Sequence, residues 1–404
     1  MKGAMQPTDL RSHNLARVLT AIVRTPEPLS RAGIAAATGL TKPTISKLVE
    51  TLIDEKLIIE GPLQRTGGSG RPTTPLLPAP KTVCGLGIQV SADHAAILAR
   101  DLAGETLITH KEYGTNHGRP DRAAELVGQL ISDAHNALPE GCTIAGITIA
   151  VPGRMSADRT KVVSSPGLDW ADIDFASMVH TAALGKVSAP AALPSPLLGN
   201  DTRLVARSEL ISRAEESFLL VHGETGIGGT IVLNGEILHG DLGWAGEIGH
   251  TTLDPHGPRC QCGRRGCLEA FASAWALREA AHVPEHVHID ELAHRIDGAV
   301  LEKAGLWLGV AISSALTLLD LQTVILSGYF GELFDAIETP VRRALDAHCL
   351  SAPSAPITLA KSAFAGDSTL VGATQYALLP LLNDPVSWIE RDRSGAAHTP
   401  LERV

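Results

Sequence analysis

Apolar residues near the N-terminus recur at helical spacing and predict three short helices. The first helix has its apolar face at Leu15, Val18, Leu19, Ile22 and Val23, and Pro26 and Pro28 end it. Ser30 is placed to cap a second helix that reaches Ala37. Gly39 then makes a turn, and Thr41 is placed to cap a third helix that runs to about Lys56.

The third predicted helix has two different faces. Its apolar face consists of Ile45, Leu48, Val49 and Leu52. The opposite side of its N-terminal half carries polar and basic residues, namely Lys42, Thr44, Ser46 and Lys47. This is typical of the recognition helix of a helix-turn-helix, which enters the major groove with its N-terminal end first. The four polar side chains contact either base edges or only solvent and phosphates.

Two short apolar runs after this helix predict a β-hairpin, or wing. They are residues 57–60 and 73–77, and they flank a glycine-rich stretch that carries Arg65 and Arg71. These two cations are suited to a phosphate backbone or a narrow minor groove, although a mobile turn before a linker has the same composition. Prolines at 72, 75, 78 and 80 predict a stiff connector, so the head spans residues 1–80.

Beyond residue 80, apolar β runs alternate with helical segments and predict two α/β lobes. The predicted strands cover residues 83–90, 95–101, 144–151, 218–222 and 230–233. We place the first lobe at residues 81–200 and the second at 201–404. Residues after Pro385 are polar and lack a period, which predicts a frayed tail.

Charge is distributed unevenly between these parts. The first 80 residues hold ten Lys and Arg against six Asp and Glu, whereas the remainder holds 24 against 38. A basic head on an acidic body suits a nucleic-acid reader attached to a domain that phosphate repels. No signal peptide and no uninterrupted apolar run of membrane-spanning length is evident, so we expect a cytoplasmic protein that does not enter a membrane.

Half of the six cysteines fall within eight residues and predict a metal site. Cys260, Cys262 and Cys267 follow His250 at short spacing, with Gly263 and Gly266 in the tight loop. Three thiolates and one imidazole are a donor set that tetrahedral structural Zn²⁺ prefers. The alternative is three ordinary thiols beside a surface histidine.

The Gly-Glu-Ile-Gly-His run at 246–250, followed by Cys-x-Cys-Gly-x-x-Gly-Cys-x-Glu at 260–269, resembles the zinc motif of the ROK family of sugar-responsive repressors and sugar kinases. The resemblance implies a body of the hexokinase/actin-like, ribonuclease H-like type. It also implies a sugar site formed by Asn200, Asp201, Glu247, His250 and Glu269. A converging set of acceptors suits a polyol, while Asp201 can equally cap the helix that follows it.

The kinase features of that family are incomplete. At the first hairpin, where kinases of the family carry Asp-x-Gly-Gly-Thr, this interpretation places Gly87 at the Asp position and Gln89 and Val90 at the two glycines. Loss of a metal-linked carboxylate and a phosphate cradle argues against ATP chemistry. The glycine-rich run at 226–230 fits either a phosphate contact or a tight turn before a strand.

We therefore expect a non-enzymatic, sugar-responsive DNA-binding regulator, most simply a repressor of carbohydrate uptake or catabolism genes. It would bind two-fold operator DNA as a homodimer or dimer of dimers. One alternative is an ATP-dependent sugar kinase with an appended DNA-binding domain. Another is a regulator controlled by docking of a second protein.

Overall fold

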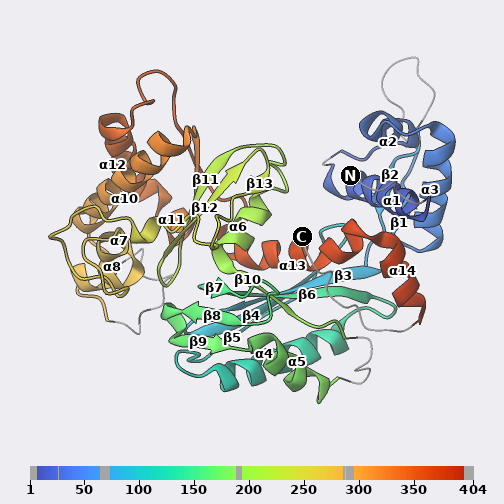
Figure 1. Cartoon of the computed structure of the whole chain (residues 1–404), viewed down its shortest axis with the longest axis horizontal. Coiled ribbons are helices and arrows are strands. Elements are labelled where there is room, and N and C mark those ends of the chain that lie inside the picture. The colour runs from blue at the N-terminus through green and yellow to red at the C-terminus, as the bar shows by residue number, and fades with distance from the viewer. Residues whose placement is uncertain are drawn as a thin grey trace.

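The computed structural model describes residues 7–25, 27–63, 73–187, 193–284, 287 and 295–394. Figure 1 shows a small head, a first lobe beneath it and a second lobe on the opposite side. The head contains α1 (Pro7–Arg24), α2 (Arg31–Thr38), α3 (Lys42–Asp54), β1 (Ile58–Glu60) and β2 (Leu76–Pro78).

The local sequence explains where the head helices begin and end. The Ser30 hydroxyl accepts the Gly33 N–H and caps α2, and Gly39 ends that helix with a φ of 69°. Thr41 is the N-cap residue of α3, as predicted, but its side chain makes no bond to the helix backbone. Its hydroxyl lies 2.8 Å from that of Thr44 instead.

β1 and β2 pair antiparallel, with Ile58 opposite Pro78. This confirms the base of the predicted wing and the winged helix-turn-helix arrangement. The wing tip, with Arg65 and Arg71, lies outside the described residues.

The first lobe is a mixed five-stranded sheet in the order β10-β6-β3-β4-β5. Its strands are β3 (Val83–Val90), β4 (His94–Asp101), β5 (Thr106–Tyr113), β6 (Thr143–Val151) and β10 (Leu197–Asn200). The helices α4 (Pro120–Ala137) and α5 (Phe175–Leu184) pack on each other beside it. A smaller sheet consists of β7 (Arg154–Met155), β8 (Val162–Ser165) and β9 (Trp170–Ile173), with the short helix η1 (Pro166–Leu168) between the last two strands.

The second lobe has its own five-stranded sheet in the order β13-β12-β11-β14-β15. Its strands are β11 (Phe218–Gly223), β12 (Ile227–Leu233), β13 (Glu236–Ile237), β14 (Thr323–Gly328) and β15 (Thr358–Lys361). Its helical elements are α6 (Asp201–Glu209), η3 (Ile248–His250), α7 (Glu269–Ala272), α8 (Ala274–Ala280), α10 (Gly298–Leu319), α11 (Tyr329–Glu332), α12 (Phe334–His348) and η4 (Ala365–Asp367).

One of these helices, α10, is long and apolar enough to cross a membrane by composition alone. In this fold it is a core helix that packs along α12. Its side chains Leu301, Leu308, Ile312 and Leu316 are buried. The apolar run is therefore explained by the core of the second lobe.

The last two helices return to the first lobe and the head. α13 (Ser368–Asn383) packs on β3, β4 and β6, and glycines in the sheet make room for its backbone. A Cβ at Gly85 would lie 2.3 Å from the Thr374 carbonyl oxygen, which no residue but glycine tolerates. α13 therefore packs on the sheet of the first lobe, although its residues follow the second lobe in sequence.

α14 (Pro385–Ser394) replaces the frayed tail that we expected after Pro385. Trp388 and Ile389 are buried in one cluster with Leu15 and Leu19 of α1 and with Leu381 of α13. The prediction was wrong because two apolar residues among charged ones show no period, yet they suffice to dock a short helix. The head is thus packed directly on the C-terminal helices, as Figure 1 shows.

Candidate functional site

The structure brings His250, Cys260, Cys262 and Cys267 together as one possible metal site. Their ligand atoms all lie within 4.8 Å of one another. The Cys262 and Cys267 sulfurs are 3.8 Å apart, and the Cys260 sulfur is 3.9 Å from His250 Nδ1. Zinc–sulfur bonds of about 2.3 Å place the sulfurs of a tetrahedral site about 3.8 Å apart. The donor set and its spacing therefore fit the ion that the sequence suggested.

Three of the five expected sugar residues cluster beside this metal site. The Glu269 Oε2 atom is 3.7 Å from His250 Nδ1, while its Oε1 accepts the Ile227 N–H at 2.9 Å. Burial raises the pKa of Glu247, although part of this residue reaches solvent. The charge of Glu269 also raises this pKa, whereas the charges of His250 and Arg203 lower it. Glu247, His250 and Glu269 therefore share one neighbourhood on the second lobe.

The other two expected sugar residues lie at the start of α6. Asn200 Oδ1 accepts the Arg203 N–H and is the N-cap, and its Nδ2 donates to the Gly153 carbonyl of the first lobe. Asp201 is already inside the helix and accepts the Thr202 N–H at 2.7 Å. The helix cap is therefore formed by Asn200 and not by Asp201. The described hydrogen bonds of Asp201 all use Oδ1, so Oδ2 has none among them.

The glycine-rich run at 226–230 lies between the two groups of expected sugar residues, those at the start of α6 and those beside the metal site. A Cβ at Gly228 would lie 2.1 Å from Thr202 Oγ1 on α6, and one at Gly229 would lie 2.4 Å from the Gly246 carbonyl. Most of these residues belong to β12 itself rather than to a turn before it. Close packing explains the glycines, so they carry no argument for phosphate binding.

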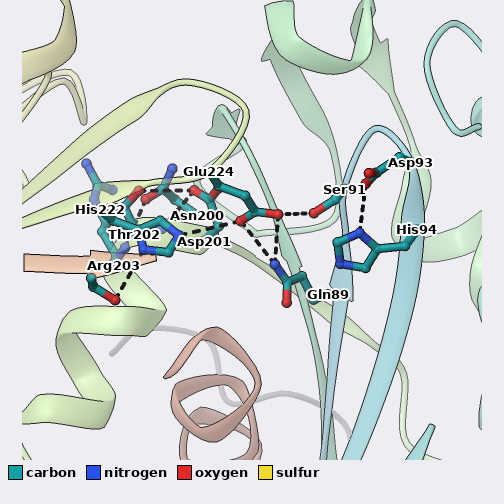
Figure 2. Close-up of polar contacts among 11 residues, drawn as sticks. Gln89, Ser91, Asp93, His94, Asn200, Asp201, Thr202, Arg203, His222 and Glu224 are labelled. Atoms are coloured by element: carbon teal, nitrogen blue, oxygen red, sulfur yellow. Dashed lines mark hydrogen bonds and ion pairs between the residues drawn. The ribbon is translucent and has the colours of Figure 1, made fainter. Parts of the chain in front are cut away.

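Glu224 joins the two lobes by hydrogen bonds and was not singled out in the sequence. Its carboxylate, in the turn between β11 and β12, accepts from Gln89 Nε2 at 2.9 and 3.0 Å and from the Ser91 hydroxyl on the first lobe. His222 Nε2 lies 3.4 Å from the same carboxylate. Figure 2 shows Gln89 of β3 and Ser91, just after that strand, pointing at Glu224. A charged residue between Gly223 and Gly226 was the available signal.

The pKa values of Asp201 and Glu224 are shifted in opposite directions. Burial and the nearby charge of Glu224 raise the pKa of Asp201 to about 6. Burial alone would raise the pKa of Glu224. Hydrogen bonds with His222 and Ser91 and the charge on His222 outweigh burial and hold this pKa below its usual value. Glu224 is therefore the group that stays ionised, and Asp201 is the group that accepts a proton as the pH falls.

The two hairpin positions Gly87 and Gln89 lie on the same face of β3. Gly87 faces α13, where a Cβ would lie 2.5 Å from the Leu370 carbonyl oxygen. Gln89, two residues later, donates to the Glu224 carboxylate of the second lobe. The structure thus places an amide, paired with a carboxylate, between the lobes.

The recognition helix presents the side chains that the sequence assigned to DNA. Lys42 and Lys47 are exposed on α3, and Thr44 and Ser46 are half-buried. The apolar face of α3 is buried in the head, as predicted from its spacing. The N-terminal half of α3 is thus free to meet another surface.

The fold and site together define the class of this protein. A model of the ROK family matches residues 85–379, and a model of the MarR family matches residues 15–71. The first match covers most of the chain, so the chain belongs to the ROK family.

Particular relatives include both regulators and kinases. The chain is 30% identical over 310 residues to the Xylose repressor of Bacillus spizizenii, which covers 74% of this chain and 78% of that protein. A solved ROK family transcriptional regulator, a homologue of the Escherichia coli MLC protein, has a TM-score of 0.75 at 24% identity and covers 94% of this chain and 99% of its own. A ROK family glucokinase from Streptomyces griseus, in complex with glucose and AMPPNP, has a TM-score of 0.61 at 22% identity and covers 73% and 99%. Both structural likenesses show the shared fold.

Proposed function

We propose that this protein is a sugar-responsive transcriptional repressor of carbohydrate genes, acting on chromosomal DNA in the cytoplasm. The observation that carries the proposal is continuous packing from the candidate sugar residues to the head. α13 packs on α6, whose first turn contains Asp201, and its C-terminal part packs with α14 on α1. A sugar that changes the position of α6 therefore has a route to the DNA-reading head. Similarity to the Xylose repressor supports the same function.

The DNA contacts in this proposal come from Lys42, Thr44, Ser46 and Lys47 on α3, with Arg65 and Arg71 in the wing. The protein acts as a homodimer or dimer of dimers, because a head of this kind reads two half-sites. Sedimentation of the purified protein, with and without operator DNA, tests the assembly. A monomer at the concentrations that bind DNA contradicts it.

The sugar is held by Asn200, Asp201, Glu247, His250 and Glu269. Zn²⁺ at His250, Cys260, Cys262 and Cys267 is structural, since four protein ligands leave no position for a reacting water. Elemental analysis should give one zinc per chain. Cys262→Ser should lose the ion and lower the melting temperature, whereas Cys142→Ser, far from the cluster, should retain it.

The alternative of a sugar kinase is disfavoured by Glu224. A carboxylate that stays ionised between the lobes repels nucleotide phosphates, and phosphoryl transfer depends on neutralising the phosphate charge. Incubation with ATP, Mg²⁺ and a panel of sugars tests this point directly. Sugar-dependent ADP release at catalytic rates would show that the protein is a sugar kinase.

The central experiment is a titration of the protein against its own promoter DNA at fixed salt, with and without each sugar of a panel. Lys47→Ala should weaken DNA binding, and Lys303→Ala, an exposed helical lysine on α10, should not. One sugar should change the DNA affinity. Tight DNA binding that no sugar changes would contradict sugar control and leave control by a docked protein.

A further inference from the structure

Two arginines outside the expected sites flank Tyr376 on α13, and a third, Arg203, lies close enough to act on one of them. The guanidinium carbon of Arg159 lies 4.6 Å from the centre of the Tyr376 ring, and that of Arg207 lies 5.5 Å from it. Arg203 is one turn before Arg207 on α6, and its Nη2 donates to the Gly243 carbonyl at 2.6 Å. All three arginines are half-buried. They come from the β7–β8 loop of the first lobe and from α6.

The charges that act on this arginine cluster are largely positive. Burial, together with the charges of Arg24 and Arg159, lowers the pKa of Arg207 to about 10. Burial and the charge of Arg203 likewise lower the pKa of Arg159. Among the described residues, no Asp or Glu forms an ion pair with Arg203 or Arg207, although Glu247 acts on Arg203 from farther away. The fold thus holds like charges close together.

We infer that Arg159, Arg203 and Arg207 form a binding site for a phosphate-sized dianion. Guanidinium groups offer several fixed N–H donors that match phosphate oxygens, and a dianion would offset the repulsion within the cluster. Packing of the Arg159 and Arg207 guanidinium groups on the Tyr376 ring keeps their donors in place before the ligand arrives.

The ligand is the phosphate of a small metabolite rather than the DNA backbone. In Figure 1, α3 lies on the side of the head that faces away from α6, so DNA read by α3 does not lie beside this cluster. Arg24, at the end of α1, adds a positive charge from the head. A bound anion would attract it and so favour the present position of the head against the body.

The test uses the full chain and inorganic phosphate, compared with chloride at equal ionic strength. Phosphate should raise the melting temperature by a few degrees at concentrations well above its Kd, and calorimetry should give the Kd. Arg207→Gln should weaken phosphate binding at least tenfold, and Arg207→Lys should retain part of it. Arg342→Gln removes an exposed arginine that pairs with Glu338 and should keep the full shift.

Stability without phosphate separates a binding role from a packing role. Arg207→Gln removes repulsion, so in chloride it should be no less stable than the natural protein. Equal melting in phosphate and chloride overturns the site. The site is also overturned if Arg207→Gln is destabilised but keeps the phosphate-induced rise in melting temperature. It is overturned as well if Arg342→Gln loses as much of that rise as Arg207→Gln does.

A comparison of glucose, glucose 6-phosphate and inorganic phosphate identifies the source of the anion. If the ester binds at least tenfold more tightly than either part, and Arg207→Gln removes that gain, the phosphate belongs to the sugar effector. Phosphate binding that no sugar changes identifies a separate anionic metabolite. Both outcomes support the site. This comparison alone rests on the proposed sugar function, so its failure leaves the phosphate result standing.

Discussion

Asp201 is the residue whose chemistry depends most directly on pH. Its pKa rises from 3.8 to about 6 through burial and the charge of Glu224. Because the folded-state value is the higher one, the stability from neutral Asp201 is fully present below pH 3.8 and is lost as the pH rises through 6. Asp201→Asn should therefore gain about 1–3 kcal/mol of stability at pH 7.5 and nothing at pH 3.5.

The same substitution should abolish the pH dependence of sugar binding. A carboxylate accepts at both oxygens, so sugar affinity of the natural protein should fall as the pH drops below 6. Denaturant unfolding between pH 3.5 and 8 and sugar titration between pH 4 and 8 measure the two effects. An Asn variant that is less stable at pH 7.5 would show that the charged form of Asp201 is not the costly one.

Glu224 should hold the two lobes together. Glu224→Ala removes the acceptor for Gln89 and Ser91, whose hydrogen bonds join the two lobes, and should cost about 1–3 kcal/mol of stability. Small-angle scattering should then give a larger radius of gyration. Glu236→Ala, which removes an exposed carboxylate on β13 of the same sheet, is the matched control. An unchanged radius in Glu224→Ala would show that other contacts hold the lobes together.

At the scale of elements, α14 should determine how firmly the head is held. Trp388 is 2% exposed and packs in the cluster that joins α1 to α13. Trp388→Ala should cost about 3–5 kcal/mol unless α14 detaches first, which would limit the loss. Glu390→Ala, exposed on the same helix, should be neutral. Limited proteolysis should release the head faster from the Trp388 variant, and equal release from both variants would contradict this role.

Elements with a strong local signal could be predicted from the sequence. The three head helices, the β runs of both lobes and the cysteine cluster each depend on spacing within a few residues. The contacts that cross the chain could not. Gln89 and Glu224 are 135 positions apart, and α14 is stabilised by α1 at the other end of the chain. Their local sequence contains no information about these partners, because tertiary packing decides them.

In the whole molecule, α13 contacts both α6, which carries two of the proposed sugar residues, and α1 of the proposed DNA-binding head. Thermodynamic linkage then requires reciprocity: the factor by which the sugar changes DNA affinity is the factor by which DNA changes sugar affinity. Typical coupling of about 1–3 kcal/mol corresponds to roughly 5–150-fold.

We expect the sugar that acts in the promoter titration to show this factor in both directions. Sugar affinity measured by calorimetry, with saturating operator DNA and without it, should change by the ratio found for DNA with and without sugar. Trp388→Ala should reduce both ratios together, because it loosens the packing of α14 on the head while leaving the proposed sugar residues untouched. Glu390→Ala should leave both unchanged. Equal coupling in the two variants would mean that the signal reaches the DNA through the assembly of chains rather than through the C-terminal helices.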